Sequence, residues 1–401
     1  MTLVLLIDLD DTLLDSNLEE FIPAYFQALS NHLADKVPES KLLPALIGGT
    51  KRMYENKDPE RTLQEAFENY FYPALGLQKE DLAEKINAFY ADVFPTLRGL
   101  TKPKSEAQNF IDWACRQGFR LILATDPVFP RAATHQRVTW AGLDPAIFEV
   151  ISTFERFHFT KQNPSYYSEL LGRIGWPDDP TIMAGNDGER DILPAQRMGI
   201  STYLLSSNGQ YQSIDSPGTV FGDFVKFRKL ITSTEHSTFK INFRSQQAQI
   251  ANLCATPAVL AGLSSSLSGE EWSFKVNSED WALTEIVCHL RDSELEINQM
   301  QIRMFDEQAE PFIPRPDAAV WARQRAYLSE EGNNALHEFS KARQETLSLL
   351  DQLVDDAWTR KARHSIFGPT DFLEVVGFMT EHDRLHIHQA WNALRGIKAQ
   401  V

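Results

Sequence analysis

Short runs of apolar and β-branched residues alternate with longer stretches of helical spacing over residues 1–232, and this rhythm restricts the fold more than any other feature of the chain. Such alternation is typical of a parallel sheet whose strands are joined by crossover helices. Most of the runs are apolar at nearly every position, as expected for strands that are buried on both faces. The predicted strands are Leu3–Ile7, Arg120–Ala124, Glu149–Ile151, Thr181–Ala184 and Thr202–Leu205.

A long helical segment interrupts this alternation between the first and second predicted strands. Residues 17–98 carry apolar side chains at helical spacing and contain no clear strand. The segment is too long for one crossover helix, so we interpret it as an inserted all-α subdomain in an α/β fold. Two of its apolar stripes are Phe21, Ala24, Tyr25 and Leu29, and Leu63, Ala66, Phe67 and Tyr70.

The chain becomes polar and loses its periodicity at residues 233–241, which we interpret as a linker to a second domain, residues 242–401. This second domain has four long helical patterns and no convincing strand. Pro257 predicts a kink or a break in the first pattern, and the prolines of Glu310–Trp321 predict an irregular connection. Four helices with a long central connection indicate an all-α four-helix bundle. The patterns are Ser245–Leu263, Trp281–Phe305, Asn333–Leu353 and Thr370–Leu394.

Charge and cysteine content narrow the class of protein. The chain has 39 Lys and Arg against 55 Asp and Glu, and its net charge of -16 argues against a nucleic-acid partner. Its three cysteines are widely spaced and form no CxxC, which fits a reducing compartment and excludes a disulfide framework. No apolar stretch approaches the roughly 20 residues that span a bilayer, and Leu3–Ile7 is too short for a signal peptide. We therefore expect a cytoplasmic protein without a membrane partner.

Two carboxylates follow the first predicted strand. Alternation sends Asp8 and Asp10 in the same direction, off the carboxyl end of the strand, where open α/β sheets bind ligands. The two side chains repel each other unless a cation lies between them. An Asp nucleophile beside a second Asp that transfers a proton would use such a pair. The alternative is a solvated acidic turn.

Three later strand ends supply the other groups that a phosphoryl site needs. Thr125 offers a hydroxyl after the second strand, Lys161 offers a cation after the third, and Gly185–Asp191 is an acidic turn after the fourth. Each has a plainer explanation, namely a helix cap, a solvated lysine and an ordinary loop. Together, however, they follow the order nucleophile, hydroxyl, cation and acid.

This order and these residues resemble the haloacid dehalogenase (HAD) superfamily over residues 1–232. The opening Asp8-Leu9-Asp10-Asp11-Thr12 and the three later turns look like its four motifs, and the segment 17–98 looks like its helical cap inserted in a Rossmann-like core. The resemblance implies a phosphatase of a small phosphorylated metabolite. In that reaction Asp8 attacks phosphorus to form an aspartyl-phosphate, and Asp10 protonates the leaving group and then activates water. Thr125 and Lys161 would face the phosphoryl charge.

The same resemblance implies a Mg²⁺ ion, which would offset the repulsion between the nucleophile and the phosphate. Asp10 would contribute its backbone carbonyl, and in the acidic turn we prefer Asp187 as a ligand. The candidate ligands are Asp8, Asp10, Asn186, Asp187 and Asp191.

Two positions depart from the common family pattern. Asp126 stands where many relatives carry Asn, which places an extra anion near the phosphate, and Asn186 stands where many carry the first metal-binding Asp. In the cap, Lys51, Arg52 and Tyr54 are candidates to grip an anion, although such side chains are more often solvated.

Three histidines lie on apolar helix faces in the second domain. His382 and His386 are one turn apart on a stripe that continues Met379, and His289 lies on the apolar face of the helix that starts near Trp281. Three such imidazoles could hold Zn²⁺, Ni²⁺ or Fe²⁺, with water completing the coordination. The alternative is a set of hydrogen-bonded core histidines.

The helix of His289 and the segment from Phe367 to Gln389 resemble DinB-like metal-binding bundles, over about residues 242–395. The resemblance implies that His289, His382 and His386 bind a metal. It also makes a low-molecular-weight thiol a candidate partner, because this family includes thiol-dependent transferases and isomerases. We expect His388 to be exposed.

Three functions therefore remain open. The leading hypothesis is a Mg²⁺-dependent phosphatase of the HAD type that is fused to a metal-binding bundle. The alternatives are a thiol transferase in the bundle with an accessory HAD domain, and a phosphatase-like protein that has lost catalysis and serves in ligand sensing. A homodimer also remains open, because nothing in the sequence determines the oligomeric state.

Overall fold

The computed structural model describes residues 2–206, 219–314 and 320–400 of the chain. Among these residues, no helix combines the length and the apolar composition that crossing a membrane requires. The chain forms two compact units. The first consists of Met1–Tyr166, Asp178–Gln196 and Ile200–Ile241, and the second of Tyr167–Pro177, Arg197–Gly199 and Asn242–Val401.

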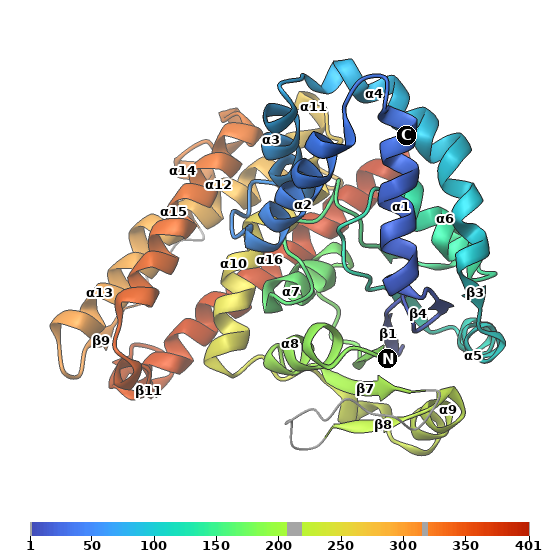
Figure 1. Ribbon diagram of the computed structural model, residues 1–401. Helices are drawn as coiled ribbons and strands as arrows, with labels where there is room; N and C mark the ends of the chain where they lie inside the picture. The colour runs from blue at the N-terminus through green and yellow to red at the C-terminus, as the bar shows by residue number, and fades with distance from the viewer. Residues whose placement is uncertain (1, 207–218, 315–319, 401) are drawn as a thin grey trace. The chain divides into compact units, whose positions relative to one another are not determined.

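A six-stranded parallel sheet lies at the centre of the first unit, with the strand order β5-β4-β1-β6-β7-β8 (Figure 1). All five predicted strands are present, and the α/β prediction is confirmed. The structure adds an edge strand, β8, which the apolar pattern does not indicate because its apolar run is only two residues long, Val220 and Phe221. The strands are β1 Val4–Ile7, β4 Arg120–Leu123, β5 Val150–Ile151, β6 Thr181–Gly185, β7 Ser201–Leu205 and β8 Val220–Gly222.

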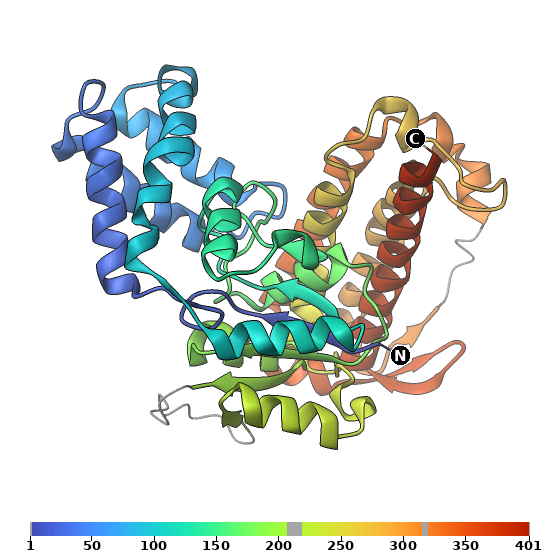
Figure 2. The ribbon, with the colours of Figure 1, turned by 90° about the vertical axis from the view of Figure 1, so that its right-hand side faces the viewer.

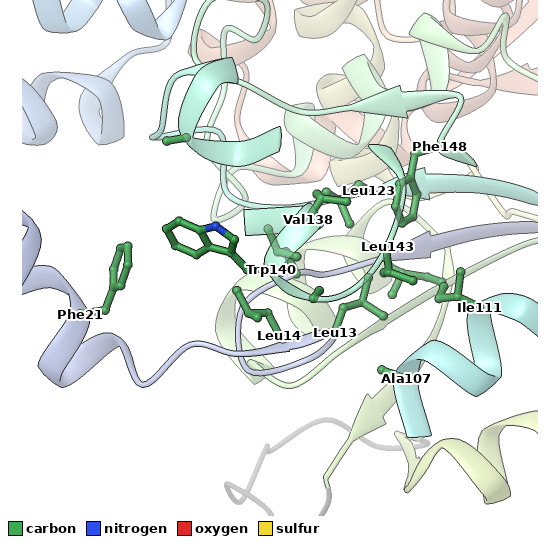
Figure 3. Close-up of a cluster of buried hydrophobic side chains, with 14 of the residues drawn as sticks. Leu13, Leu14, Phe21, Ala107, Ile111, Leu123, Val138, Trp140, Leu143 and Phe148 are labelled. Carbon is green, nitrogen blue, oxygen red and sulfur yellow. The ribbon is translucent and has the colours of Figure 1, made fainter. Parts of the chain in front are cut away.

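Alternate strand residues build the apolar core on one face of the sheet. Leu5 and Ile7 of β1 and Leu123 of β4 belong to one buried cluster with side chains of the neighbouring helices. Figure 3 shows part of this cluster, where Val138 lies beside Leu123. The helices along this part of the chain are α5 Ser105–Arg116, α6 Arg131–Trp140, α7 Pro164–Arg173, α8 Leu193–Arg197 and α9 Phe224–Ser233.

The inserted segment is helical throughout and forms a cap, drawn in blue in Figure 1. It departs from the sheet domain through β2 Leu14–Asp15 and returns through β3 Lys102–Pro103, and these two strands pair antiparallel. Phe21 of the cap packs against Trp140 of α6, with ring centroids 6.3 Å apart. The cap helices are α1 Leu18–Leu33, α2 Glu39–Glu55, α3 Leu63–Leu75 and α4 Lys79–Ala88, followed by a π-helical turn, Phe89–Val93, and a 3₁₀ helix, Phe94–Leu100.

Four long helical segments run side by side in the second unit, coloured yellow to red in Figure 2. They match the four predicted patterns, and the helical-bundle prediction is confirmed. Pro257 does not split its helix, which continues to Ser264. The second segment runs on through a π-helical turn, Glu294–Asn298. The segments are α10 Gln246–Ser264, α12 Leu283–Ser293 with α13 Gln299–Glu307, α15 Gly332–Gln352 and α16 Phe372–Gln400; the short helices are α11 Gly269–Trp272 and α14 Trp321–Gln324.

The prediction that the second domain lacks strands is wrong. A small sheet of order β11-β10-β9 pairs β9 Phe312–Ile313 with β10 Lys361–His364, and β10 with β11 Gly368–Asp371. β9 falls within the predicted irregular connection Glu310–Trp321, of which residues 315–319, including Pro316, lie outside the described residues. These strands escape the apolar pattern because they are two to four residues long and fewer than half of their residues are buried.

Candidate active site and histidine cluster

The turn after β1 aims the first two aspartates at the carboxyl edge of the sheet. The Asp8 backbone N–H donates to the Ala184 carbonyl at 3.0 Å, so Asp8 still follows the β1–β6 ladder. The chain then turns sharply, with three backbone N–H groups from Thr12 to Leu14 donating to the Leu9 carbonyl. Asp11 adopts a positive φ of 56° in this turn, a conformation that aspartate tolerates better than most residues.

Lys161 connects the first and last predicted motifs. Its Nζ atom donates to Asp8 Oδ1 at 2.7 Å and also forms an ion pair with Asp191. All three side chains are buried, and their exposed fractions are 8% or less. Burial raises the pKa of Asp191, with the Asp8 charge acting in the same direction and Lys161 opposing it. One buried cation therefore lies between two buried carboxyl groups.

Asp10 contacts Arg137, a cation that the sequence analysis did not identify. Arg137 of α6 forms an ion pair with Asp10 Oδ1, and the Ser16 hydroxyl donates to the same oxygen at 2.5 Å. The Arg137 side chain is 1% exposed, and its guanidinium lies 4.8 Å from the Phe129 ring centroid. Burial lowers the pKa of Arg137 to about 10, so the group remains protonated at neutral pH.

Asp126, the first departure from the family pattern, is tied down by two donors. The Tyr54 hydroxyl of the cap donates to its Oδ2 at 3.0 Å, and the Lys161 backbone N–H donates to its Oδ1 at 3.2 Å. Burial raises the pKa of Asp126. The preceding Thr125 is buried, and its carbonyl accepts from Ser152 and Tyr166 at 2.6 and 3.0 Å. The Thr125 backbone is thus held firmly where β4 ends.

The acidic turn after β6 separates its three candidate ligands. Asn186 Oδ1 accepts from the Thr12 hydroxyl at 2.9 Å, which brings the first and fourth motifs together. Asp187 Oδ1 accepts from the Glu189 and Arg190 backbone N–H groups at 2.8 and 3.1 Å, so it caps the helical turn that follows. Asp191, one turn later, is the residue that reaches Lys161.

The two anion-gripping candidates on α2 remain in solvent. Lys51 and Arg52 are 72% and 58% exposed, and both pair with Glu55. Tyr54 behaves differently, because its hydroxyl reaches Asp126. Of the three cap residues named from the sequence, only Tyr54 approaches the strand ends.

The donor set at the sheet edge suits a hard divalent cation. The ligand atoms on offer are side-chain oxygens of Asp8, Asn186 and Asp191, and Mg²⁺ prefers oxygen ligands. Two carboxyl groups share a single lysine here, so when both are ionised their negative charge exceeds the charge of the lysine. A divalent cation would correct that imbalance.

The three predicted histidines meet inside the bundle. His382 Nε2 lies 3.0 Å from His289 Nε2 and 3.1 Å from His386 Nε2. Gln389 Oε1 lies 2.7 Å from His386 Nδ1; with Nδ1–H as the donor, the lone pair of His386 Nε2 points to the other two rings. The Nε2 atom of a neutral imidazole carries either one hydrogen or one lone pair, so His382 Nε2 can form a hydrogen bond with only one of its two neighbours. Hydrogen bonds among three neutral imidazoles therefore cannot account for both contacts. The donor set fits a cation placed between three lone pairs.

Burial keeps two of these imidazoles, those of His289 and His386, neutral. It lowers the pKa of His289 to about 4 and that of His386 to about 3, and the neighbouring His289 lowers the latter further. Trp281 stacks on His386, with ring centroids 5.7 Å apart. His388 is exposed, as predicted. Neutral imidazole is the form that binds metals.

Arg137 is the main site residue that the sequence interpretation missed. It lies four residues after Ala133 and one before Val138, on the buried face of α6. A charged residue on an otherwise apolar helical stripe is the signal that could have identified it.

Two family models match separate parts of the chain. Residues 2–199 match the model of the haloacid dehalogenase-like hydrolase family, and residues 253–390 match the DinB superfamily. No curated protein matches the chain.

Several solved structures are similar to one part of the chain or the other. A 2-haloacid dehalogenase from Pseudomonas syringae pv. Tomato DC3000 is 19% identical, with a TM-score of 0.44, over 58% of this chain and 99% of that one. A HAD phosphatase from Thermococcus onnurineus is 17% identical, with a TM-score of 0.39, over 58% and 98%. YfiT from Bacillus subtilis, described as a probable metal-dependent hydrolase with an unusual four-helix bundle topology, is 18% identical, with a TM-score of 0.35, over 38% and 90%.

Proposed function

Because residues 2–199 belong to the haloacid dehalogenase-like hydrolases and residues 253–390 to the DinB superfamily, we propose that this hydrolase is a Mg²⁺-dependent phosphatase joined to a histidine metal site. The observation that carries the proposal is the buried contact of Lys161 with both Asp8 and Asp191. A lysine held in this way can face a phosphoryl group that arrives at Asp8, where catalysis depends on positioning and charge.

Asp8 is the proposed nucleophile. One of its carboxylate oxygens attacks phosphorus, the bond from phosphorus to the ester oxygen breaks, and an aspartyl-phosphate forms. The alcohol leaves with a proton from Asp10. Water then attacks the aspartyl-phosphate while Asp10 takes a proton from it, which releases phosphate and restores Asp8.

Arg137 and Ser16 support the second of these steps. Both contact Asp10 Oδ1, and a carboxylate that is paired with a buried guanidinium is held in one orientation. For the first step a proton must reach Asp10, so the pair with Arg137 has to loosen when substrate arrives. We propose Arg137 as a positioning residue that acts through Asp10.

Mg²⁺ would be held by Asp8, the Asp10 carbonyl, Asn186 and Asp191. When bound, it would offset the charge of the nucleophile and the phosphate. Asp187 remains a candidate, but one of its oxygens already caps the following turn. The substrate is proposed to be a small phosphorylated metabolite.

Phosphate release from a simple phosphate monoester in the presence of Mg²⁺ tests the proposal. Asp8→Asn should abolish turnover, since an amide cannot replace the carboxylate nucleophile. Asp15→Asn is the matched control, because Asp15 is exposed on β2 and should leave the rate unchanged. Equal rates in the wild type and Asp8→Asn would exclude Asp8 as the nucleophile.

The convergence of three Nε2 atoms supports a second proposal, that the bundle binds Zn²⁺, Ni²⁺ or Fe²⁺ through His289, His382 and His386. Metal analysis of the purified protein tests it. His382→Ala should remove the metal, whereas His388→Ala, on the same helix but exposed, should retain it. A metal content that is the same in both variants would refute the site. A thiol-dependent transfer in the bundle would require the same three histidines.

A further inference from the structure

A cavity of about 790 Å³ lies within the first unit, between the cap helices and the loop after β4. This volume is in the range of small-molecule binding sites. Asp10, Asp126 and Arg190 are among its lining residues, so the cavity reaches the candidate active site. A substrate whose phosphate lies at Asp8 would place the rest of its structure here.

The walls contributed by the cap are mainly apolar. Helices α1 to α4 present aliphatic and aromatic side chains, several of them buried in the core of the same unit. Binding an apolar substrate group against such a wall is favourable by roughly 25 cal/mol per Å² of apolar surface removed from water. The side chains that matter most for this argument are Ile22, Phe26, Leu29, Met53, Phe67 and Phe71.

Several polar groups of these walls are occupied by one another. The Tyr25 and Tyr90 hydroxyls share a hydrogen bond of 2.8 Å, and burial raises the pKa of Tyr25 to about 12, so it stays neutral. Lys79 lies 2.8 Å from Glu68 as an ion pair.

Two acceptors in this wall lack a hydrogen-bond partner. Gln136 Oε1 and Glu155 Oε2 are buried and have no hydrogen-bond partner among the residues that the structure describes. A sugar or a nucleoside carries several hydroxyl groups, and each one that is buried without a partner costs about 1–3 kcal/mol. Hydroxyl groups of such a leaving group that face Ile22, Phe26 or Leu29 would have no partner on that wall.

We propose that the alcohol half of the substrate is bulky and apolar, either aromatic or branched aliphatic, and that sugar and nucleoside phosphates are poor substrates. This inference rests on the proposed phosphatase function. It adds the chemical class of the group that the cap selects.

Three esters of primary alcohols test the proposal, because their leaving groups are chemically similar. They are 2-(1-naphthyl)ethyl phosphate, glucose 6-phosphate and ethyl phosphate. We expect kcat/KM for the naphthylethyl ester to exceed that for each of the others at least tenfold, which corresponds to about 1.4 kcal/mol. Turnover of ethyl phosphate with no preference for the apolar ester would overturn this inference alone. No turnover of any ester would overturn the phosphatase function and this inference with it.

Substitutions of cavity-lining residues test whether the cavity causes the preference for the apolar ester. Ala83→Phe, on α4, narrows the cavity and should lower the ratio of kcat/KM for the naphthylethyl ester over ethyl phosphate at least tenfold. Ala74→Phe is the matched control, because Ala74 is exposed on α3 and is not among the lining residues. Ile22→Asn makes the wall more polar and should lower the same ratio, which gives a second reading if Ala83→Phe folds poorly. An unchanged ratio in a folded cavity variant would refute the proposal.

Discussion

Replacing Arg343 tests whether a buried charge network holds the bundle together. Arg343 of α15 forms ion pairs with Glu294 at 2.7 Å and with Asp383 at 2.6 Å, and the side chains of all three are 2% exposed or less. Arg343→Met keeps the length of the side chain but leaves two carboxyl groups buried without a cation. Removing one partner of a buried ion pair costs about 3–5 kcal/mol. For a domain of roughly 150–250 residues, that loss lowers the melting temperature by about 6–20 °C.

The network bears on the proposed metal site because Asp383 follows His382 directly on α16. Arg343→Met should therefore weaken metal retention as well as stability. Calorimetry of the full chain at pH 8 and pH 5 provides the assay. The loss should be smaller at pH 5, because burial raises the pKa of Asp383 and protonation relieves the unpaired charge. Lys341→Met, exposed on the same helix, should change stability by at most about 0.5 kcal/mol. A loss below about 1 kcal/mol in Arg343→Met, or an equal loss at both pH values, would refute this reasoning.

The remaining predictions concern the two candidate sites. Lys161→Met should lower kcat at least a hundredfold and lower the melting temperature, because Asp8 and Asp191 are left buried without their cation. Activity assays and thermal unfolding measure the two effects, and an unaltered kcat would contradict the proposed role of Lys161. Asp126→Asn should lower KM for a phosphate ester, since it removes a buried anion, and a raised KM measured in steady-state kinetics would count against this view. The metal-free protein should lose stability as the pH falls below about 6.5 towards 4. His289 and His386 bind protons in the unfolded chain in this range, whereas their lowered pKa values keep them neutral in the folded protein. Urea unfolding at pH 7 and pH 5 checks this, and His289→Leu should reduce the dependence.

Strands that are buried on both faces could be predicted from the sequence, and exposed ones could not. β1 and β6 are buried at every position, so their runs of apolar residues stand out. β8 lies at the sheet edge with Phe221 52% exposed, and its apolar run of two residues is too short to stand out. β9 and β10 pair across about fifty residues of chain, and their hydrogen bonds are formed by the backbone, which no local pattern of side chains encodes.

The candidate site divides in the same way. Asp8, Lys161 and Asp191 follow strands in a recognisable order, and the parallel sheet brings their side chains together. The histidine cluster could be predicted because helical spacing places His382 and His386 one turn apart. Arg137 was missed because its contact with Asp10 depends on how α6 packs, and the cavity was missed because it arises only when the cap helices meet the loop after β4.

The pairing of β2 with β3 has a consequence for the history and the engineering of this chain. Residues Asp15 and Lys102 are direct partners, so the whole cap begins and ends at neighbouring points. An insertion whose ends already touch places little demand on the domain that hosts it, because the entropy of closing a loop grows only slowly with its length. We therefore expect that the cap could be exchanged for a larger or smaller one while the strand register, and with it the proposed nucleophile Asp8, stays in place. Selectivity and chemistry can then change independently in this half of the protein.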